Sequence, residues 1–118
     1  MNTKEIGAFG EDAACEYLEE NDYEILERNF SLKTGEIDII AEKDDCTVFV
    51  EVKTRKNNFY GEPSEAVNWQ KQEHIRRTAL LYLNSLDTEI RFDVIEVFYR
   101  ITKDGFEASK INHIRNAF

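Results

Sequence analysis

Two short segments rich in β-branched residues constrain the fold of this chain more than any other feature. Residues 36–42 and 47–54 have the composition of β-strands, and a short turn-like stretch separates them. This arrangement predicts an antiparallel hairpin. Side chains alternate between the two faces of a strand, so Glu51 and Lys53 are expected on the same face. If the hairpin forms, Asp38 lies beside Glu51.

These three charged side chains also predict a chemistry. Asp38 and Glu51 would place two carboxylates close together on the sheet, which is costly unless a cation lies between them. A hard divalent ion bound by oxygen ligands is the usual solution in proteins. The alternative is that Glu51 and Lys53 form a solvated pair on an edge face, which would contribute less than about 1 kcal/mol. A metal-dependent site is therefore the leading idea, and the surface ion pair stays open as its alternative.

The rest of the chain predicts a mixed α/β domain. Apolar positions recur at helical spacing after Thr3 and again after Asn68, and both residues are expected helix caps. Trp69 is expected to anchor the start of the second helix in the core. The expected elements are a helix over 3–21, strands over 23–30, 36–42 and 47–54, a helix over 69–86, and strands over 91–101 and 106–112. This order, α-β-β-β-α-β-β, predicts one domain over residues 1–118, with a mixed β-sheet flanked by helices.

The charge balance is acidic but uneven. Lys and Arg number 15 against 24 Asp and Glu, a net charge of −9, which taken alone argues against a nucleic-acid partner. However, residues 1–27 contain nine acids and one lysine, whereas residues 51–77 contain six basic and four acidic residues. The acidity therefore lies mostly in the first helix, and the region that follows Glu51 is locally basic.

The cysteines and the apolar segments suggest a cellular setting. Cys15 and Cys46 have neither the spacing of a zinc site nor that of a disulfide-rich scaffold. No secretory segment is visible, and no apolar stretch approaches the roughly 20 residues that cross a bilayer. We therefore expect a cytoplasmic protein with no membrane partner, and Cys15 as a small buried side chain. His74 is expected on the polar face of the second helix and His113 in the C-terminal tail, neither with a catalytic role.

The order of the acidic residues resembles that of the restriction-endonuclease-like nucleases, whose signature is an acid followed by (D/E)-x-K on the next strand. Here the signature would be Asp38 followed by Glu51-Val52-Lys53. Ile37 stands where branches resembling archaeal Holliday-junction resolvases usually have proline, but proline itself ligates nothing. Over nearly its whole length the chain is similar to the YraN-like family of uncharacterised bacterial proteins. The motifs that carry this resemblance are Phe9-Gly10-Glu11 with Ala13-Ala14, GEIDIIA at 35–41, FVEVKTR at 49–55, and Gln70-Lys71-Gln72.

The resemblance implies hydrolysis of phosphodiester bonds. Asp38 and Glu51 would hold Mg²⁺ or Mn²⁺, with the main-chain carbonyl of Val52 as a third ligand. The ion would polarise the phosphate and lower the pKa of a water molecule, and Lys53 would orient that water or stabilise charge on the phosphate. Glu11, on the first helix, would be a fourth catalytic residue and a further metal ligand, although on its own it reads as a surface acid.

Three further residues are expected to bind nucleic acid. Lys71 and Gln72 lie early in the second helix, where N-terminal amides favour a phosphate. Arg55 is expected to contact the nucleic-acid backbone rather than to act as a catalyst. Phe59 and Tyr60, in the loop before the second helix, are weaker candidates for stacking on an unpaired base.

The leading interpretation is a metal-dependent nuclease that acts on DNA, for example on branched or single-stranded DNA. One alternative is a nucleic-acid-binding module with this fold and no turnover. Another is a subunit that works only with a partner protein, which would bind the acidic first helix through Glu16, Glu19 and Glu20. A homodimer is expected only by analogy with resolvases, which cut two strands symmetrically.

Overall fold

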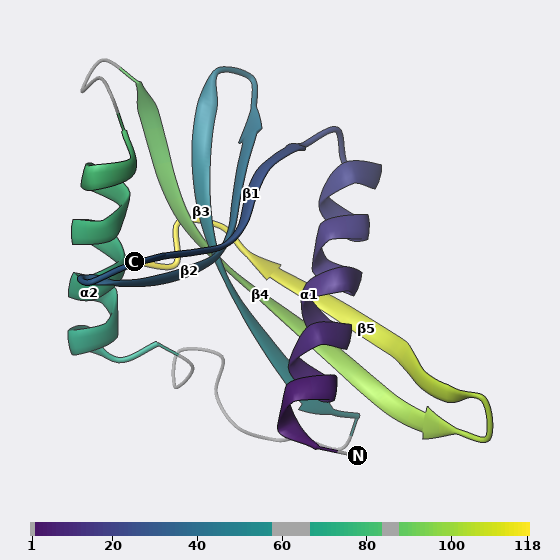
Figure 1. The fold of residues 1–118 in the computed structure, drawn as a ribbon. Coiled ribbons are helices and arrows are strands. Elements are labelled where there is room, and N and C mark those ends of the chain that lie inside the picture. Colours follow the sequence, from purple (N-terminus) through teal and green to yellow (C-terminus); the bar gives the residue numbers. More distant parts are fainter. Residues whose placement is uncertain (1, 58–66, 84–87) are drawn as a thin grey trace.

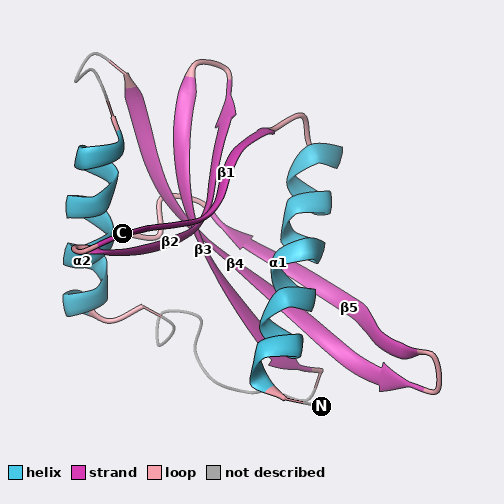
Figure 2. Cartoon of the chain, viewed as in Figure 1, coloured by secondary structure: helices cyan, strands magenta, loops and turns pink. Residues whose placement is uncertain are grey.

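Five strands and two helices account for most of the chain. The computed structural model describes residues 2–57, 67–83 and 88–118. Within them lie α1 (Thr3–Glu20), β1 (Glu24–Leu32), β2 (Gly35–Lys43), β3 (Cys46–Lys56), α2 (Trp69–Tyr82), β4 (Glu89–Thr102) and β5 (Gly105–Ile114). The strands form a single sheet, and the two helices lie on either side of it (Figures 1 and 2). The predicted α/β fold and element order are confirmed.

The strands lie in the sheet in the same order as in the sequence, from β1 to β5. The pairs β1–β2, β2–β3 and β4–β5 are antiparallel, whereas β3 and β4 are parallel, with Glu51 opposite Val94. A parallel pair needs a long connection, and here that connection contains α2. The mixed sheet therefore follows from a single crossover, which carries the chain across one face of the sheet before β4.

Two apolar clusters cover the two faces of the sheet. α1 buries Cys15 and Leu18 in one cluster with Val50 of β3. α2 buries Ile75 in the other cluster, with Phe49 of the same strand. Val50 and Phe49 are neighbours, so their opposite directions follow from the alternation of a strand. The prediction that Cys15 is buried is confirmed, and Glu51, the next residue after Val50, is directed to the side of α2.

Asparagine side chains cap both helices. The Asn2 side chain accepts a hydrogen bond from the Glu5 N–H at 2.8 Å, so the predicted cap at Thr3 is wrong by one residue. The shift is physically small, because either side chain carries the oxygen that a cap needs. Asn68 caps α2 as predicted, accepting from the Lys71 N–H at 2.9 Å.

The predicted start of α2 at Trp69 is confirmed, but its predicted C-terminal end and the predicted burial of Trp69 are wrong. The helix ends at Tyr82 rather than at residue 86, because Leu83 has an extended backbone. Trp69 is 73% exposed and does not anchor the helix in the core. Six positions separate Trp69 from the buried Ile75, which places the two side chains on different sides of a helix with 3.6 residues per turn. Neither described helix is long and apolar enough to cross a lipid bilayer.

A buried polar network ties α1 to the end of the sheet. Asp93 on β4 accepts hydrogen bonds from Arg91 at 2.8 Å and lies 2.7 Å from His113 Nε2. The other ring nitrogen of His113 lies 3.0 Å from the hydroxyl of Tyr17 on α1. Burial would raise the pKa of Asp93, but the hydrogen bonds from His113 and Arg91 outweigh it and lower that pKa. The prediction that His113 lies in a tail is wrong, because β5 extends to Ile114 and buries it.

α1 approaches β3 very closely at Gly10. A Cβ atom on Gly10 would lie 1.9 Å from Thr54 Oγ1 and 3.0 Å from Thr54 Cβ, so a larger residue requires the helix or the strand to move. Gly10 precedes Glu11 in the sequence. The glycine therefore sets how near Glu11 comes to the sheet.

Candidate functional site

The candidate site lies where β2 and β3 separate. Their ladder of paired residues ends at Ile39 and Val50. Just beyond that pair, Asp38 Oδ2 accepts a hydrogen bond of 2.8 Å from the main-chain N–H of Val52. The Asp38 carboxylate thus accepts the hydrogen bond that a main-chain carbonyl of a neighbouring strand would otherwise accept from the Val52 N–H. This bond fixes the carboxylate at the fork between the two strands.

Glu51 lies next to Asp38 and is almost fully buried, with 5% of its side chain exposed. Its Oε1 atom forms an ion pair with Lys71 of α2 and lies 3.7 Å from the ammonium of Lys53. The contact between Glu51 and Lys53 agrees with the prediction that they share one face of β3. One carboxylate oxygen therefore faces two ammonium groups, which come from two different elements.

Electrostatics at the fork disfavour two free carboxylates. The pKa of Asp38 is raised to about 7, mainly by burial and next by the negative charge of Glu51. The hydrogen bond from the Val52 N–H acts in the opposite direction but is outweighed. Near neutral pH, Asp38 is therefore close to the point where it takes up a proton, unless a cation is bound nearby.

The two lysines respond differently to this environment. Burial lowers the pKa of Lys53, and the nearby charge of Lys71 lowers it further. Burial also opposes the charge on Lys71, but the hydrogen bond and the negative charge of Glu51 outweigh burial and raise its pKa. Lys71 is therefore the cation that Glu51 stabilises more strongly.

Glu11 lies on the α1 side of the fork. Burial raises the pKa of Glu11, and a hydrogen bond with Asn29 partly offsets that effect. The negative charge of Glu11 in turn raises the pKa of Asp38, so the two carboxyl groups interact electrostatically. Its role as a catalytic residue and metal ligand stays a prediction.

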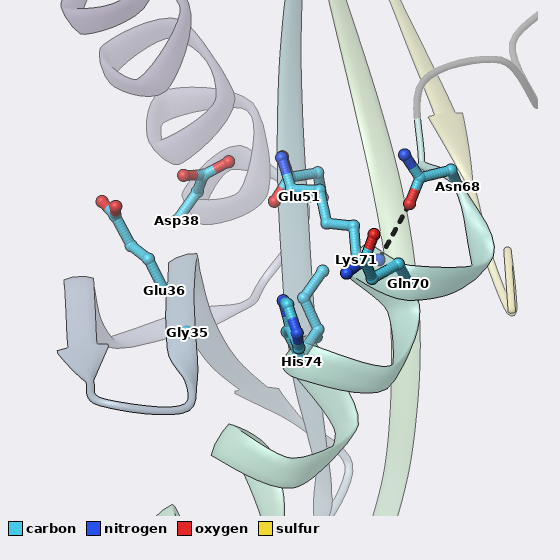
Figure 3. Close-up of a pocket in the computed structure, with 9 residues that line it drawn as sticks. Gly35, Glu36, Asp38, Glu51, Asn68, Gln70, Lys71 and His74 are labelled. Carbon is cyan, nitrogen blue, oxygen red and sulfur yellow. Dashed lines mark hydrogen bonds and ion pairs between the residues drawn. The ribbon is translucent and has the colours of Figure 1, made fainter.

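An open cleft of about 470 Å³ adjoins the fork. This volume is typical of a small-molecule site. Asp38, Glu51 and Lys71 line the cleft. Six further residues that were not predicted as site residues also line it, namely Gly35, Glu36, Asn68, Gln70, His74 and Ile75 (Figure 3). Spacing could have indicated two of them, because Gln70 and His74 are one helical turn apart and flank Lys71. His74 and Glu36 are exposed, and the exposure of His74 agrees with its predicted place on the polar face of α2.

Close contacts hold α2 against the fork. The hydroxyls of Thr34 and Thr78 lie 2.7 Å apart, which joins the turn before β2 to α2. A Cβ atom on Gly35 would lie only 3.2 Å from His74 Cβ, so the small residue at the start of β2 permits this approach. These contacts place the first turns of α2, including Lys71, next to the carboxylates.

The other two predicted nucleic-acid contacts bond within the protein. Arg55 donates a hydrogen bond of 2.8 Å to Glu96, and 15% of the Arg55 side chain is exposed. The Gln72 side chain donates to the Val67 carbonyl at 3.1 Å. Of the three predicted residues, Lys71 is the one that lines the cleft, and the nucleic-acid role of all three stays a prediction. Phe59 and Tyr60 lie outside the described residues.

The donor set at the fork suits a hard divalent ion. Across residues 2–57, 67–83 and 88–118, no three His, Cys, Asp or Glu side chains lie close enough to hold a metal ion by themselves. Asp38 and Glu51 nevertheless provide oxygen donors, and Mg²⁺ commonly binds through one or two carboxylates while it keeps several waters. The residues therefore fit an ion whose coordination is completed by the Val52 carbonyl, water or a substrate phosphate.

The residues of the fork lie in a part of the chain that matches a known protein family. The profile of Uncharacterised protein family UPF0102 matches residues 10–97. A UPF0102 protein from Clostridium beijerinckii is 49% identical over 118 residues, which cover 98% of this chain and 94% of the relative. One from Syntrophomonas wolfei is 48% identical over 118 residues, covering 98% of each chain. Another, from Acetivibrio thermocellus, is 50% identical over 121 residues, covering 99% of this chain and 93% of the relative.

Proposed function

The chain belongs to Uncharacterised protein family UPF0102, the YraN-like family that its motifs predicted, and from this premise we propose that it is a metal-dependent nuclease. The names of its relatives give no activity, so the support comes from the site itself. The proposed reaction is hydrolysis of phosphodiester bonds in DNA, with branched and single-stranded forms as the first substrates to test. We also propose that the chain is related to the restriction-endonuclease-like nucleases, including the Holliday-junction resolvases.

One observation carries this proposal. Asp38 and Glu51 come from two strands and meet at a cleft, although burial and mutual repulsion oppose two charged carboxylates there. Such an arrangement destabilises a fold, and unfavourable groupings of titratable side chains are concentrated at functional sites. A cation-binding role accounts for both the position and the identity of these residues.

Each residue then has a distinct part in the reaction. Asp38 and Glu51 would hold Mg²⁺ or Mn²⁺ together with the Val52 carbonyl, and Glu11 would be a further acid on the α1 side. When bound, such an ion supplies Lewis acidity and lowers the pKa of water toward neutrality. Lys53, 3.7 Å from Glu51, would stabilise negative charge on the scissile phosphate.

The decisive experiment compares the wild type with Asp38→Asn. Mn²⁺ would be titrated into both proteins by calorimetry, and both would be incubated with labelled duplex, flap, single-stranded and four-way-junction DNA. We expect ion binding and cleavage to disappear together in Asp38→Asn. Glu36→Gln is a matched control, because it removes an exposed carboxylate two residues away on the same strand. Equal cleavage by the wild type and Asp38→Asn would instead indicate a contaminating nuclease.

A second candidate function is a nucleic-acid-binding module with no turnover. The observation that favours it is the pairing of Glu51 with Lys71 and Lys53, since a carboxylate that already has cationic partners does not require a metal. This candidate predicts DNA binding that persists in EDTA, weakens with added salt and yields no product.

A further inference from the structure

We infer that Lys71 is a built-in competitor of the divalent ion, which holds Glu51 in the metal-free protein and transfers to a substrate phosphate when the ion takes its place. This inference rests on the proposed function and deepens it. It assigns Lys71 two successive partners and makes binding of the ion and binding of the substrate mutually dependent.

Lys71 lies at the carboxylate that would bind the ion. Its ammonium is paired with Glu51 Oε1, at the carboxylate that would bind the ion. Lys53 shares that oxygen at 3.7 Å, but it stands two residues from Glu51 on the same strand. Lys71 reaches the site from α2, across the cleft. It can therefore leave Glu51 by side-chain rotation alone, while the strands stay in place.

The charge of Glu51 can be neutralised either by Lys71 or by a divalent ion. Glu51 is 95% buried and needs a positive partner in the absence of metal, and Lys71 supplies it. A divalent ion at the same carboxylate would bring two further positive charges close to the Lys71 and Lys53 ammonium groups. Like charges at such distances repel strongly where the surroundings are partly buried. The ion and the Lys71 ammonium are therefore alternative partners of Glu51.

A displaced Lys71 side chain would remain at the cleft. The Lys71 side chain is 41% exposed, and it lines the cleft together with Asn68, Gln70 and His74. The side chains of Asn68, Gln70 and His74 are neutral or weakly basic. The acidic side chains of Asp38 and Glu36 lie on the opposite wall of the cleft (Figure 3). A phosphate that enters the cleft would therefore meet the released ammonium on the α2 side. Because linkage is reciprocal, a phosphate that holds Lys71 would also strengthen binding of the ion.

The test compares Lys71→Gln with a matched control, Arg77→Gln. Arg77 is an exposed residue of α2, so this control removes one positive charge from the same helix. Mn²⁺ would be titrated into each protein by calorimetry at low ionic strength without DNA. We expect Lys71→Gln to bind Mn²⁺ on the order of tenfold more tightly than the wild type, as loss of one competing charge predicts, and Arg77→Gln to change the affinity less than twofold. Lys71→Arg keeps the charge and should bind Mn²⁺ more weakly than Lys71→Gln.

A second measurement follows transfer to the substrate. A fluorescein-labelled single-stranded oligothymidylate would be titrated by anisotropy in Mn²⁺ and in EDTA, with cleavage followed in parallel on a gel. For the wild type, Mn²⁺ should increase the affinity for the oligonucleotide severalfold. In Lys71→Gln this increase should largely disappear, although Mn²⁺ itself binds more tightly. Arg77→Gln should retain the wild-type increase.

The outcomes separate this inference from the proposed function. If the wild type and all variants fail to bind Mn²⁺, the proposed function fails and the inference with it. If the wild type binds Mn²⁺ in a manner that Asp38→Asn abolishes, but Lys71→Gln binds no more tightly, the inference is overturned and the proposed function stands. Circular dichroism would check that each variant is folded, and Lys71→Met would replace Lys71→Gln if the latter is not.

Discussion

Replacement of Asp38 by asparagine should stabilise the metal-free protein at alkaline pH, although it removes a proposed metal ligand. Asparagine has nearly the same shape, and its amide oxygen can still accept the hydrogen bond from the Val52 N–H. What the substitution removes is the carboxylate charge next to Glu51. The prediction therefore separates the electrostatic cost of the site from its packing.

The magnitude follows from the pKa of Asp38, which is raised from 3.8 to about 7. The unfolded chain releases this proton near pH 4, whereas the folded protein keeps it until about pH 7. The folded state thus binds more protons within that window, so its stability falls as pH rises from about 4 to 7 and then levels off. Each pKa unit corresponds to about 1.4 kcal/mol, which gives a ceiling of about 4 kcal/mol. Adjustment of the nearby lysines reduces this, and we expect Asp38→Asn to gain about 2 kcal/mol at pH 8.

Urea unfolding followed by far-ultraviolet circular dichroism in EDTA, at pH 8 and at pH 4, would measure the gain. The advantage of Asp38→Asn should be present at pH 8 and nearly absent at pH 4. Glu36→Gln, which removes an exposed carboxylate nearby, should show little difference at either pH. Mn²⁺ at pH 8 should then stabilise the wild type but not Asp38→Asn, because it binds only a folded site with both carboxylates. No gain at pH 8, or an equal gain at pH 4, would refute the reasoning.

Three further predictions concern close packing and buried charges elsewhere in the fold. Gly10→Ala should lower the free energy of unfolding by about 1–3 kcal/mol, since its Cβ would lie 1.9 Å from Thr54 Oγ1. Adding Thr54→Ala should recover part of this loss in urea unfolding, and strictly additive losses would argue against the contact. Because the pKa of Asp93 is lowered, its ionised form stabilises the wild type above about pH 4, and this stability is lost as pH falls through that lowered pKa. Asp93→Asn should lack this contribution, so the acid-unfolding curve of the variant should be flatter. An unchanged slope would contradict this. Glu96→Gln should lower Tm by several degrees in a thermal melt, because it leaves the Arg55 guanidinium with a neutral partner at a buried position. An unaltered Tm would mean that the ion pair of Arg55 with Glu96 contributes nothing to the stability of the fold.

The strands and helices were predictable because they depend on local patterns. Alternation around Glu51 and Lys53 predicted a strand with those two side chains on one face, and the contact of 3.7 Å between them agrees. Asn68 was predictable as a cap, since its side chain bonds to a neighbour only three residues away. The pairing of Asp38 with Glu51 required one further assumption, namely that consecutive strands pair as a hairpin. All of these features depend on residues that are close in the sequence.

The features that escaped prediction depend on contacts between distant parts of the chain. His113 is buried because Asp93 and Tyr17, 20 and 96 residues away, surround it. Trp69 is an exception, because its exposure follows from the helical spacing that separates it from the buried Ile75. The ion pair of Lys71 with Glu51 spans 20 residues and depends on where the crossover places α2. No periodicity or short motif carries that information.

The hydrogen bond between Asp38 and the Val52 N–H has a consequence for how this site would change during evolution. The Asp38 side chain accepts a hydrogen bond from the backbone in addition to any ion that it binds. A lineage that lost catalysis would therefore still be selected to keep a hydrogen-bond acceptor at position 38. Asparagine would satisfy that selection, whereas alanine would leave the N–H without its acceptor. Asparagine at this position is thus the expected trace of an abandoned site. Among relatives, the retention of acid at position 38 and glutamate at position 51 together would distinguish descendants that still use the fork from those that only inherited its shape.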